Sequence, residues 1–232
     1  MALFTMGDLH LSLSAKKPMD VFGGAWQNYV EKILDQWHQT VGPDDVVVVL
    51  GDISWGMSLA ECREDFLFIH NLPGKKYIIK GNHDYYWTTV KKMNAYLEEI
   101  GASSMSFIFN SAVEYEEDGK KVALCGTRGW FYEDKGEDKI YNRELGRLES
   151  SLKCAAPDLT RIAFLHYPPF GLGGGSSQVT DLMERYQVKS CYYGHLHGAA
   201  LRGVRGETNL RGITYRLAIA DYLGFRPMKI EI

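Results

Sequence analysis

The sequence predicts an α/β fold with two packed sheets and helices on the outside. Short apolar runs of β-forming residues alternate with segments of helical periodicity, which is the pattern of crossover units with parallel strands. Near residue 105 this alternation gives way to a β-hairpin pattern, and the tail from Ala199 again favours strands joined by glycine turns. Parallel units combined with antiparallel strands indicate two sheets, and 232 residues fit a single domain, 1–232.

Each expected element rests on a local pattern. Apolar residues at helical spacing predict helices around 29–37 and 90–100, and an Asp118-Gly119 turn predicts a hairpin within the region that starts at Met105. In the tail, the clearest strands are "GITYRLAIA" and "PMKIEI". The five apolar runs expected to be the other strands are residues 2–6, 46–50, 77–80, 161–165 and 190–193.

Composition excludes several classes of protein. With 45% hydrophobic and 24% charged residues the chain is typical of a globular protein, and a net charge of −3 offers no global attraction to nucleic acid or an anionic membrane. No stretch reaches the roughly 18 apolar residues of a membrane span, and no signal-like run opens the chain. The four cysteines are far apart and form no CxxC pair, so we expect reduced, buried thiols and a cytoplasmic location.

Polar side chains gather where the strands end. Each of the five runs is followed by a side chain able to bind metal, whereas the two remaining histidines, His38 and His70, fall in helical stretches. Burying so many polar groups without partners would cost a few kcal/mol each, and a metal centre removes that cost. The strand-end candidates are Asp8, His10, Asp52, Asn82, His83, His166, His195 and His197.

Spacing and number favour two ions. Asp8-x-His10 and His195-x-His197 each place two side chains on one side of an extended segment. Eight groups exceed what one ion can use, whereas two ions about 3.5–4 Å apart and bridged by a carboxylate can use most of them. Carboxylate, amide and imidazole donors without a thiolate suit manganese, iron or zinc, and the choice among these three stays open.

Five motifs carry a resemblance to a known family. In order, "GDLH", "GDIS", "GNHD", "LH" before "YPP" and "GHLH" resemble the calcineurin-like metallophosphoesterase signature, and they extend from residue 7 to residue 197. The resemblance implies a four-layer α/β/β/α sandwich, in which two central mixed β-sheets are flanked by helices. It also implies a dinuclear-metal-dependent phosphohydrolase in which metal-bound hydroxide cleaves a phosphomonoester or phosphodiester bond of a small substrate.

The resemblance also implies a role for each residue. One metal would be bound by Asp8, His10, Asp52 and His197, and the other by Asp52, Asn82, His166 and His195, with Asp52 bridging. His83 would lie off the metals beside the substrate, stabilising the transition state or protonating the leaving oxygen, with Asp84 orienting it. Imidazole suits that proton transfer at neutral pH. The alternatives are a non-catalytic His83 and an Asp84 that caps a helix beginning near Tyr86.

Other residues bear on the substrate. "GDISWGMS" lacks the arginine of protein phosphatases, and no separate nucleic-acid-binding domain fits, so we expect a small phosphoester, with nucleotides among the candidates. Arg128 could clamp phosphate, or be a surface arginine in a turn. Aromatic residues beside the motifs could stack on a leaving group or pack in the core. These are Trp55, Tyr85, Tyr86 and Trp130.

Two other functions fit parts of the pattern. A non-catalytic scaffold of the same fold would be expected to lose ligands or His83, and this chain keeps both. A metal hydrolase acting on another bond could also use H-x-H pairs. Asn82 within G-N-H-D argues against that second alternative, because an amide ligand there is a feature of the phosphoesterase pattern.

Overall fold

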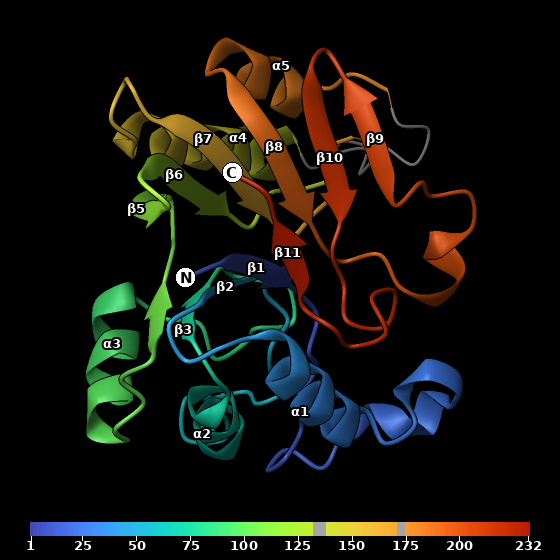
Figure 1. Ribbon diagram of the computed structural model, residues 1–232. Coiled ribbons are helices and arrows are strands. Elements are labelled where there is room, and N and C mark those ends of the chain that lie inside the picture. Colours follow the sequence, from blue (N-terminus) through green and yellow to red (C-terminus); the bar gives the residue numbers. More distant parts are fainter. Residues whose placement is uncertain (132–137, 171–174) are drawn as a thin grey trace.

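Two β-sheets face each other in the computed structural model, and helices cover both outer sides (Figure 1). The structure describes residues 1–131, 138–170 and 175–232. The first sheet has the strand order β11-β1-β2-β3-β4, and the second has the order β5-β6-β7-β8-β10-β9. Helices α1, α2 and α3 lie on the first sheet, and α4 and α5 lie on the second. The predicted fold class, a four-layer α/β/β/α sandwich, is therefore confirmed.

The strands are three to eight residues long, and the α-helices are eight to 17 residues long. The strands of the first sheet are β1 Leu3–Met6, β2 Val46–Val49, β3 Lys75–Ile78, β4 Met105–Phe107 and β11 Met228–Ile230. Those of the second are β5 Ser111–Glu117, β6 Lys120–Thr127, β7 Thr160–Leu165, β8 Val188–Tyr193, β9 Glu207–Leu210 and β10 Ile213–Leu217. The α-helices are α1 Tyr29–Thr40, α2 Arg63–Asn71, α3 Val90–Glu99, α4 Asp138–Cys154 and α5 Gln178–Arg185, and the 3₁₀ turns are η1 Met19–Phe22, η2 Gly24–Trp26 and η3 Gly198–Leu201. Within the described ranges, no helix combines the length and apolar character that crossing a membrane requires.

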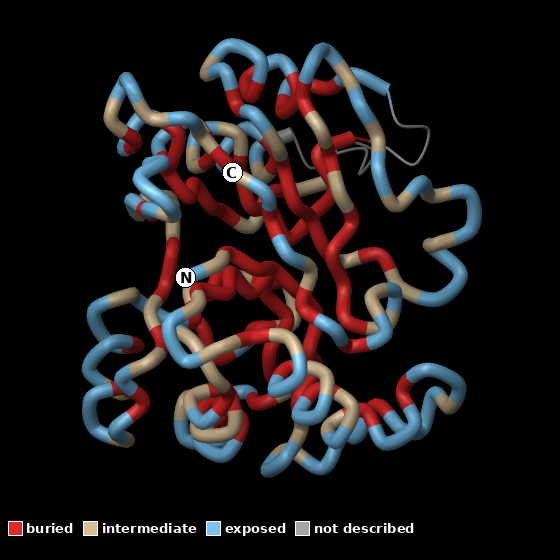
Figure 2. Tube along the Cα trace, viewed as in Figure 1, coloured by how far each residue is buried: buried red, intermediate tan, exposed pale blue. Residues whose placement is uncertain are grey.

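Buried side chains form three layers between these elements. Leu50, Leu124 and Phe164 belong to the layer between the two sheets, which explains why β1 and β2 are buried on both faces. A second layer joins the first sheet to α1, α2 and α3, and a third joins the second sheet to α4 and α5. Figure 2 shows the same division, with buried strands inside and exposed helix surfaces outside.

Parallel pairing brings the carboxyl ends of several strands to the same edge. In the first sheet β1, β2, β3 and β4 are parallel, and in the second sheet β6, β7, β8 and β10 are parallel. The register aligns the strands closely, because Leu3 pairs with Val46 and Val46 pairs with Lys75. The loops that follow β1, β2 and β3 therefore start side by side.

Some expectations need correction. Met105–Phe107 pairs in parallel with β3 in the first sheet, because its short apolar run completes that sheet rather than joining the hairpin. The hairpin itself is β5–β6, and its Asp118-Gly119 turn has φ values of 50° and 79°.

Cys154 is exposed, whereas the other three cysteines are buried as expected. Residues 132–137 and 171–174 lie outside the described residues.

Candidate metal centre and active site

The candidate site lies where the carboxyl ends of β1, β2 and β3 meet those of β7 and β8. Hydrogen bonds join the two sheets at this edge. The amide of Gly7 donates to the carbonyl of Ala218 at 2.7 Å, and Nδ1 of His166 lies 2.9 Å from the carbonyl oxygen of Leu50. Because the Leu50 carbonyl accepts a hydrogen bond from Nδ1–H of His166, Nε2 of that ring carries the lone pair and faces the site.

One group of ligand-type atoms comes from Asp8, His10 and His197. Nε2 of His197 lies 3.0 Å from Oδ1 of Asp8 and 3.4 Å from Nε2 of His10. One potential ligand atom from each of these residues falls within 4.8 Å of the others. His197, beyond β8, lies 187 and 189 positions from His10 and Asp8, which follow β1, so only the packing of the two sheets brings His197 to them.

A second group adjoins the first. Asp8, Asp52 and His166 also have ligand-type atoms within 4.8 Å of one another. Nε2 of His166 lies 2.6 Å from Oδ1 of Asn82 and 3.2 Å from Nδ1 of His195. Carboxylate, amide and imidazole donors thus converge from strands of both sheets.

Asp52 belongs to the second group and also faces His10 of the first. Its Oδ1 accepts the backbone N–H of His83 at 2.7 Å, which holds the carboxylate in one orientation. Its Oδ2 lies 3.9 Å from Nε2 of His10 and 3.6 Å from Nε2 of His166. A single oxygen atom therefore faces donors of both groups.

The backbone at the site is strained. Asp8, His10, Asp52 and His195 have φ values of 60°, 47°, 49° and 75°, in the left-handed region that non-glycine residues rarely adopt. Each such residue costs on the order of 1–3 kcal/mol, and such strain is concentrated at functional sites. These left-handed residues turn the chain immediately after each strand ends. The side chains that follow neighbouring strands therefore point toward the same place.

Close approach explains two of the motif glycines. A Cβ at Gly81 would collide with the carboxylate of Asp52, and a Cβ at Gly194 would collide with that of Asp8. Because glycine has no side chain, the backbone at these two positions can lie directly against each buried carboxylate. The amide of His195, next to Gly194, donates to Asp8 at 3.1 Å.

The electrostatics of the imidazoles suit cation binding. Burial lowers the pKa of His10 and the pKa of His195 to about 3, so both rings are neutral at pH 7 and present a free lone pair. Burial also opposes the charge of His197, but its hydrogen bonds with Asp221 and Asp8 raise its pKa to about 10. A cation would take the place of that proton beside Asp8.

The two carboxylates need positive charge nearby. Burial would raise the pKa of Asp8, but the hydrogen bond with His197 and the neighbouring His166 hold that pKa well below its usual range. Burial and the charge of Asp8 raise the pKa of Asp52 well above its usual value. Two buried acids this close repel each other, and cations bound between them would remove the repulsion. The ligand atoms here include no thiolate, and such a set fits divalent ions.

His83 lies beside both groups. Its Nδ1 lies 3.1 Å from Oη of Tyr85, and its ring centroid lies 4.6 Å from that of Trp55 and 5.8 Å from that of His10. Burial and the charge of His166 lower the pKa of the His83 ring. The half-buried ring therefore borders the site and remains open to an approaching molecule.

The contacts of Asp84 differ from the expected ones. Its buried carboxylate accepts the backbone N–H groups of Asp52, Ile53 and Gly81 at 3.0, 2.9 and 2.7 Å. These contacts bind together the loops after β2 and β3, and burial raises the pKa of Asp84 to about 7. No hydrogen bond in the described structure joins Asp84 to the His83 ring. Asp84 does not cap a helix either, since the N-cap of α3 is Thr89.

Arg128 lies close to the site through its backbone. Its carbonyl accepts the amides of His166 and Tyr167 at 3.1 and 2.9 Å. Its guanidinium, however, lies 3.0 Å from the buried carboxylate of Glu144 and 4.8 Å from the centroid of Trp130. The side chain is therefore already paired within the protein.

The aromatic candidates separate by environment. Tyr86 is buried in the core beside α2 and α3, as the packing alternative predicted. Trp55 stacks on His10 with ring centroids 5.1 Å apart, and Tyr85 is half exposed next to His83. Trp55 and Tyr85 thus border the candidate site.

Two site residues were missed from the sequence. Oδ1 of Asp221 lies 3.1 Å from Nδ1 of His197 and holds that ring. It follows the apolar run "GITYRLAIA", so the strand-end signal that marked the other candidates could have found it. Trp26 packs against His10 and His197 with centroids 5.8 and 5.7 Å away, and no sequence pattern indicated it.

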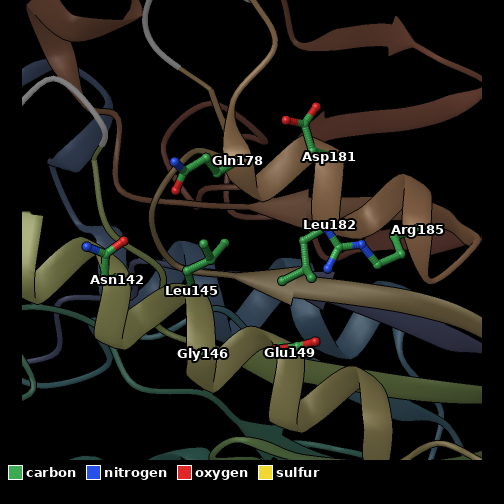
Figure 3. A pocket seen from close by; sticks show the side chains of 8 residues that line it. All are labelled: Asn142, Leu145, Gly146, Glu149, Gln178, Asp181, Leu182 and Arg185. Atoms are coloured by element: carbon green, nitrogen blue, oxygen red, sulfur yellow. The ribbon is translucent and has the colours of Figure 1, made fainter.

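A separate pocket lies between α4 and α5. Figure 3 shows its lining, which includes Asn142, Glu149, Gln178 and Arg185. None of the candidate site residues lines it. This pocket is therefore separate from the candidate metal centre.

Comparisons with known proteins agree with this geometry. The fold is similar to that of phosphopantetheinyl hydrolase (PptH) from Mycobacterium tuberculosis, with a TM-score of 0.61 and 12% identity over 99% of this chain and 95% of that one. It is also similar to the protein of unknown function AQ665 from Aquifex aeolicus, with a TM-score of 0.51 and 18% identity over 98% and 95% of the two chains. At these identities the likeness concerns the fold alone.

Sequence comparison gives a more specific result. The Gene 66 protein of Mycobacterium phage D29 is 42% identical over 52 residues, which are 22% of this chain and 26% of that protein, so the match spans about a quarter of that relative. Residues 1–199 match the family described as calcineurin-like phosphoesterase. This match includes every predicted ligand and most of both sheets. The chain therefore belongs to the calcineurin-like phosphoesterase family.

Proposed function

We propose that the chain is a dinuclear-metal-dependent phosphoesterase acting on a phosphomonoester or phosphodiester of a small molecule, with nucleotides among the candidates. The observation that carries the proposal is the position of Asp52, whose Oδ2 faces His10 of one group and His166 of the other. A carboxylate oxygen that faces two sets of ligand atoms would suit a pair of closely spaced ions.

The residues divide between two ions. The first would be held by Asp8, His10, Asp52 and His197, and the second by Asp52, Asn82, His166 and His195. The hydrogen bond of His166 to Leu50 and that of His197 to Asp221 orient two of the imidazoles toward the ions. Manganese, iron and zinc all suit these donors.

The chain and the ions contribute different chemistry. Bound divalent ions would acidify water and neutralise the charge of the phosphoryl oxygens. His83 borders the centre without belonging to either donor set, with its ring fixed between Trp55 and Tyr85. From there it would support the departing oxygen and deliver a proton to it. Asp84 would act on His83 only indirectly, by fixing the loop that carries it.

Hydrolysis assays separate this function from its alternatives. Protein loaded with Mn²⁺ should hydrolyse an aryl phosphate or an aryl phosphodiester, and inorganic phosphate should inhibit competitively, because it resembles the product. Absence of activity on both substrates and on a broader phosphoester panel would favour a non-catalytic scaffold. Cleavage of another bond without inhibition by phosphate would assign the chain to a different class of metal hydrolase.

His83→Ala should retain both metals yet lose most turnover. Loss of an acid that protonates the leaving group lowers kcat by about 10²–10⁴-fold. Metal content by elemental analysis and kcat are measured on the same preparation. His38→Ala, which changes an exposed histidine of α1, is the matched control and should have parental values. A His83→Ala enzyme with wild-type kcat would exclude the catalytic assignment.

Arg128→Ala tests the proposed phosphate clamp. If Arg128 leaves Glu144 to bind substrate phosphate, its loss should raise KM by about tenfold, the effect of one hydrogen bond between charged groups. Arg143→Ala is the control, since Arg143 lies 3.5 Å from the same Glu144 but is half exposed. Unchanged KM and kcat in Arg128→Ala would show that Arg128 only neutralises Glu144.

Asp221→Ala should weaken metal binding. Asp221 orients His197, and loss of such a partner lowers metal affinity by about 10–100-fold. Affinity is measured by titration against a competing chelator, with Asp221→Asn expected to be intermediate. Asp35→Ala on the exposed side of α1 serves as the control. If Asp221→Ala binds metal with the same affinity as the parent protein, Asp221 does not contribute to the metal centre.

A further inference from the structure

An apolar groove lies beside the candidate site. It has a volume of about 350 Å³ and is lined by Met19, Val21 and Phe22 of η1, by Trp55, and by Lys16 and Lys17. Val21 and Phe22 are 76% and 72% exposed, the highest values among the exposed large hydrophobic residues of the described chain. We call this feature the η1 groove. Exposed apolar side chains gathered in a hollow are typical of a binding surface.

Trp55 both lines the η1 groove and contacts the candidate metal centre. The indole stacks on the imidazole of His10, with centroids 5.1 Å apart and planes 23° apart, and its centroid lies 4.6 Å from that of His83. The groove therefore begins at the ring that borders both His10 and His83. A molecule whose phosphorus lies at the metal centre and whose departing oxygen meets His83 would extend its alcohol portion along this wall.

The wall of the groove is held firmly by the core. Met19 and Trp26 are buried, and Trp26 packs against His10 and His197 of the metal centre. Where η1 meets η2, Gly23 and Gly24 have φ values of 60° and 57°, and the chain turns so that Phe22 is exposed while Trp26 is buried. One short segment thus supports the metal centre and presents apolar side chains to the solvent.

The charge of the groove limits what it can bind. Among the described residues that line it, the charged ones are two lysines and none is acidic. Nζ of Lys17 lies 6.0 Å from the centroid of the Trp55 ring. A group bound here would be apolar beside Trp55 and neutral or anionic at its far end, whereas a cationic end would be repelled.

We propose that the η1 groove binds the leaving alcohol of the substrate and that this alcohol is an apolar alkyl or aryl group. This inference rests on the proposed function. Water attacks phosphorus, the bond between phosphorus and the alcohol oxygen breaks, and one proton of the water is transferred to that oxygen. The products are the apolar alcohol and the phosphate or phosphomonoester. Burial of the alcohol against Trp55 and η1 selects the substrate.

Alkylphosphonates test the groove without requiring turnover. Methylphosphonate and hexylphosphonate present the same anionic head, and they differ in the apolar chain that the groove would bind. Calorimetry on the Mn²⁺-loaded protein should show hexylphosphonate binding about tenfold more tightly, the lower end of the effect of an added apolar group in a pocket. A chain of the same length with a terminal trimethylammonium group should bind more weakly than hexylphosphonate.

A double variant and a control locate the effect. Val21→Ser combined with Phe22→Ser should remove the preference for the longer chain. Leu34→Ser, which changes an exposed apolar residue of α1 outside the groove, should preserve it. Thermal unfolding establishes that all variants are folded. Equal affinity for the two phosphonates in the parent, or an unchanged preference in the double variant, overturns the proposal.

Parallel assays distinguish this inference from the proposed function. Binding preference without hydrolysis of methyl or hexyl phosphate would contradict the proposed function and leave the groove in place. Hydrolysis of both esters with equal kcat/KM, together with equal phosphonate affinities, would contradict the groove alone. If the double variant instead converts a dimer into a monomer without changing phosphonate preference, the groove belongs to a second copy of this chain and the proposal fails.

Discussion

Two buried carboxylates, Asp8 and Asp52, impose the constraint on which the rest of this structure depends. Each is kept from water and held by an amide of a loop from another strand: His83 donates to Asp52, and His195 donates to Asp8. Such acids repel each other in a low-dielectric interior unless positive charge lies nearby. The need to stabilise these two acids accounts for three features of the site. Glycines lie beside both carboxylates, the backbone at the strand ends is left-handed, and imidazoles point inward toward the acids.

The centre exists only when the two sheets are packed together. Asp8 and Asp52 follow strands of the first sheet, whereas His166 and His195 follow strands of the second. The contact of His166 with the Leu50 carbonyl crosses between them. Ions bound here would therefore favour the folded chain, since the unfolded chain has no equivalent site. Metal binding and sheet packing are expected to reinforce each other.

The segment containing η1 and η2 connects the reaction centre to substrate choice. Trp26 supports the two imidazoles of one donor group, and Phe22, four residues earlier, lies in the groove that we assign to the leaving alcohol. The general chemistry of the site arises from the strand ends shared by both sheets. Selection among phosphoesters would arise from this short loop, whose shape is set by two glycines and by buried anchors.

The sequence by itself determined the fold class and the candidate ligands, because strand periodicity and the polar residues that follow each strand are local signals. Tertiary structure decided which groups meet. The carboxylate of Asp84 accepts backbone N–H groups rather than contacting the His83 ring. Arg128 pairs with Glu144. Asp221 contacts His197 from a strand end that was not among the predicted site residues. Each of these contacts joins segments that are far apart in the sequence, and no local sequence pattern indicates that they lie close together in space. Burial and packing across two sheets determine them, since a buried polar group must find its partner wherever the fold places one.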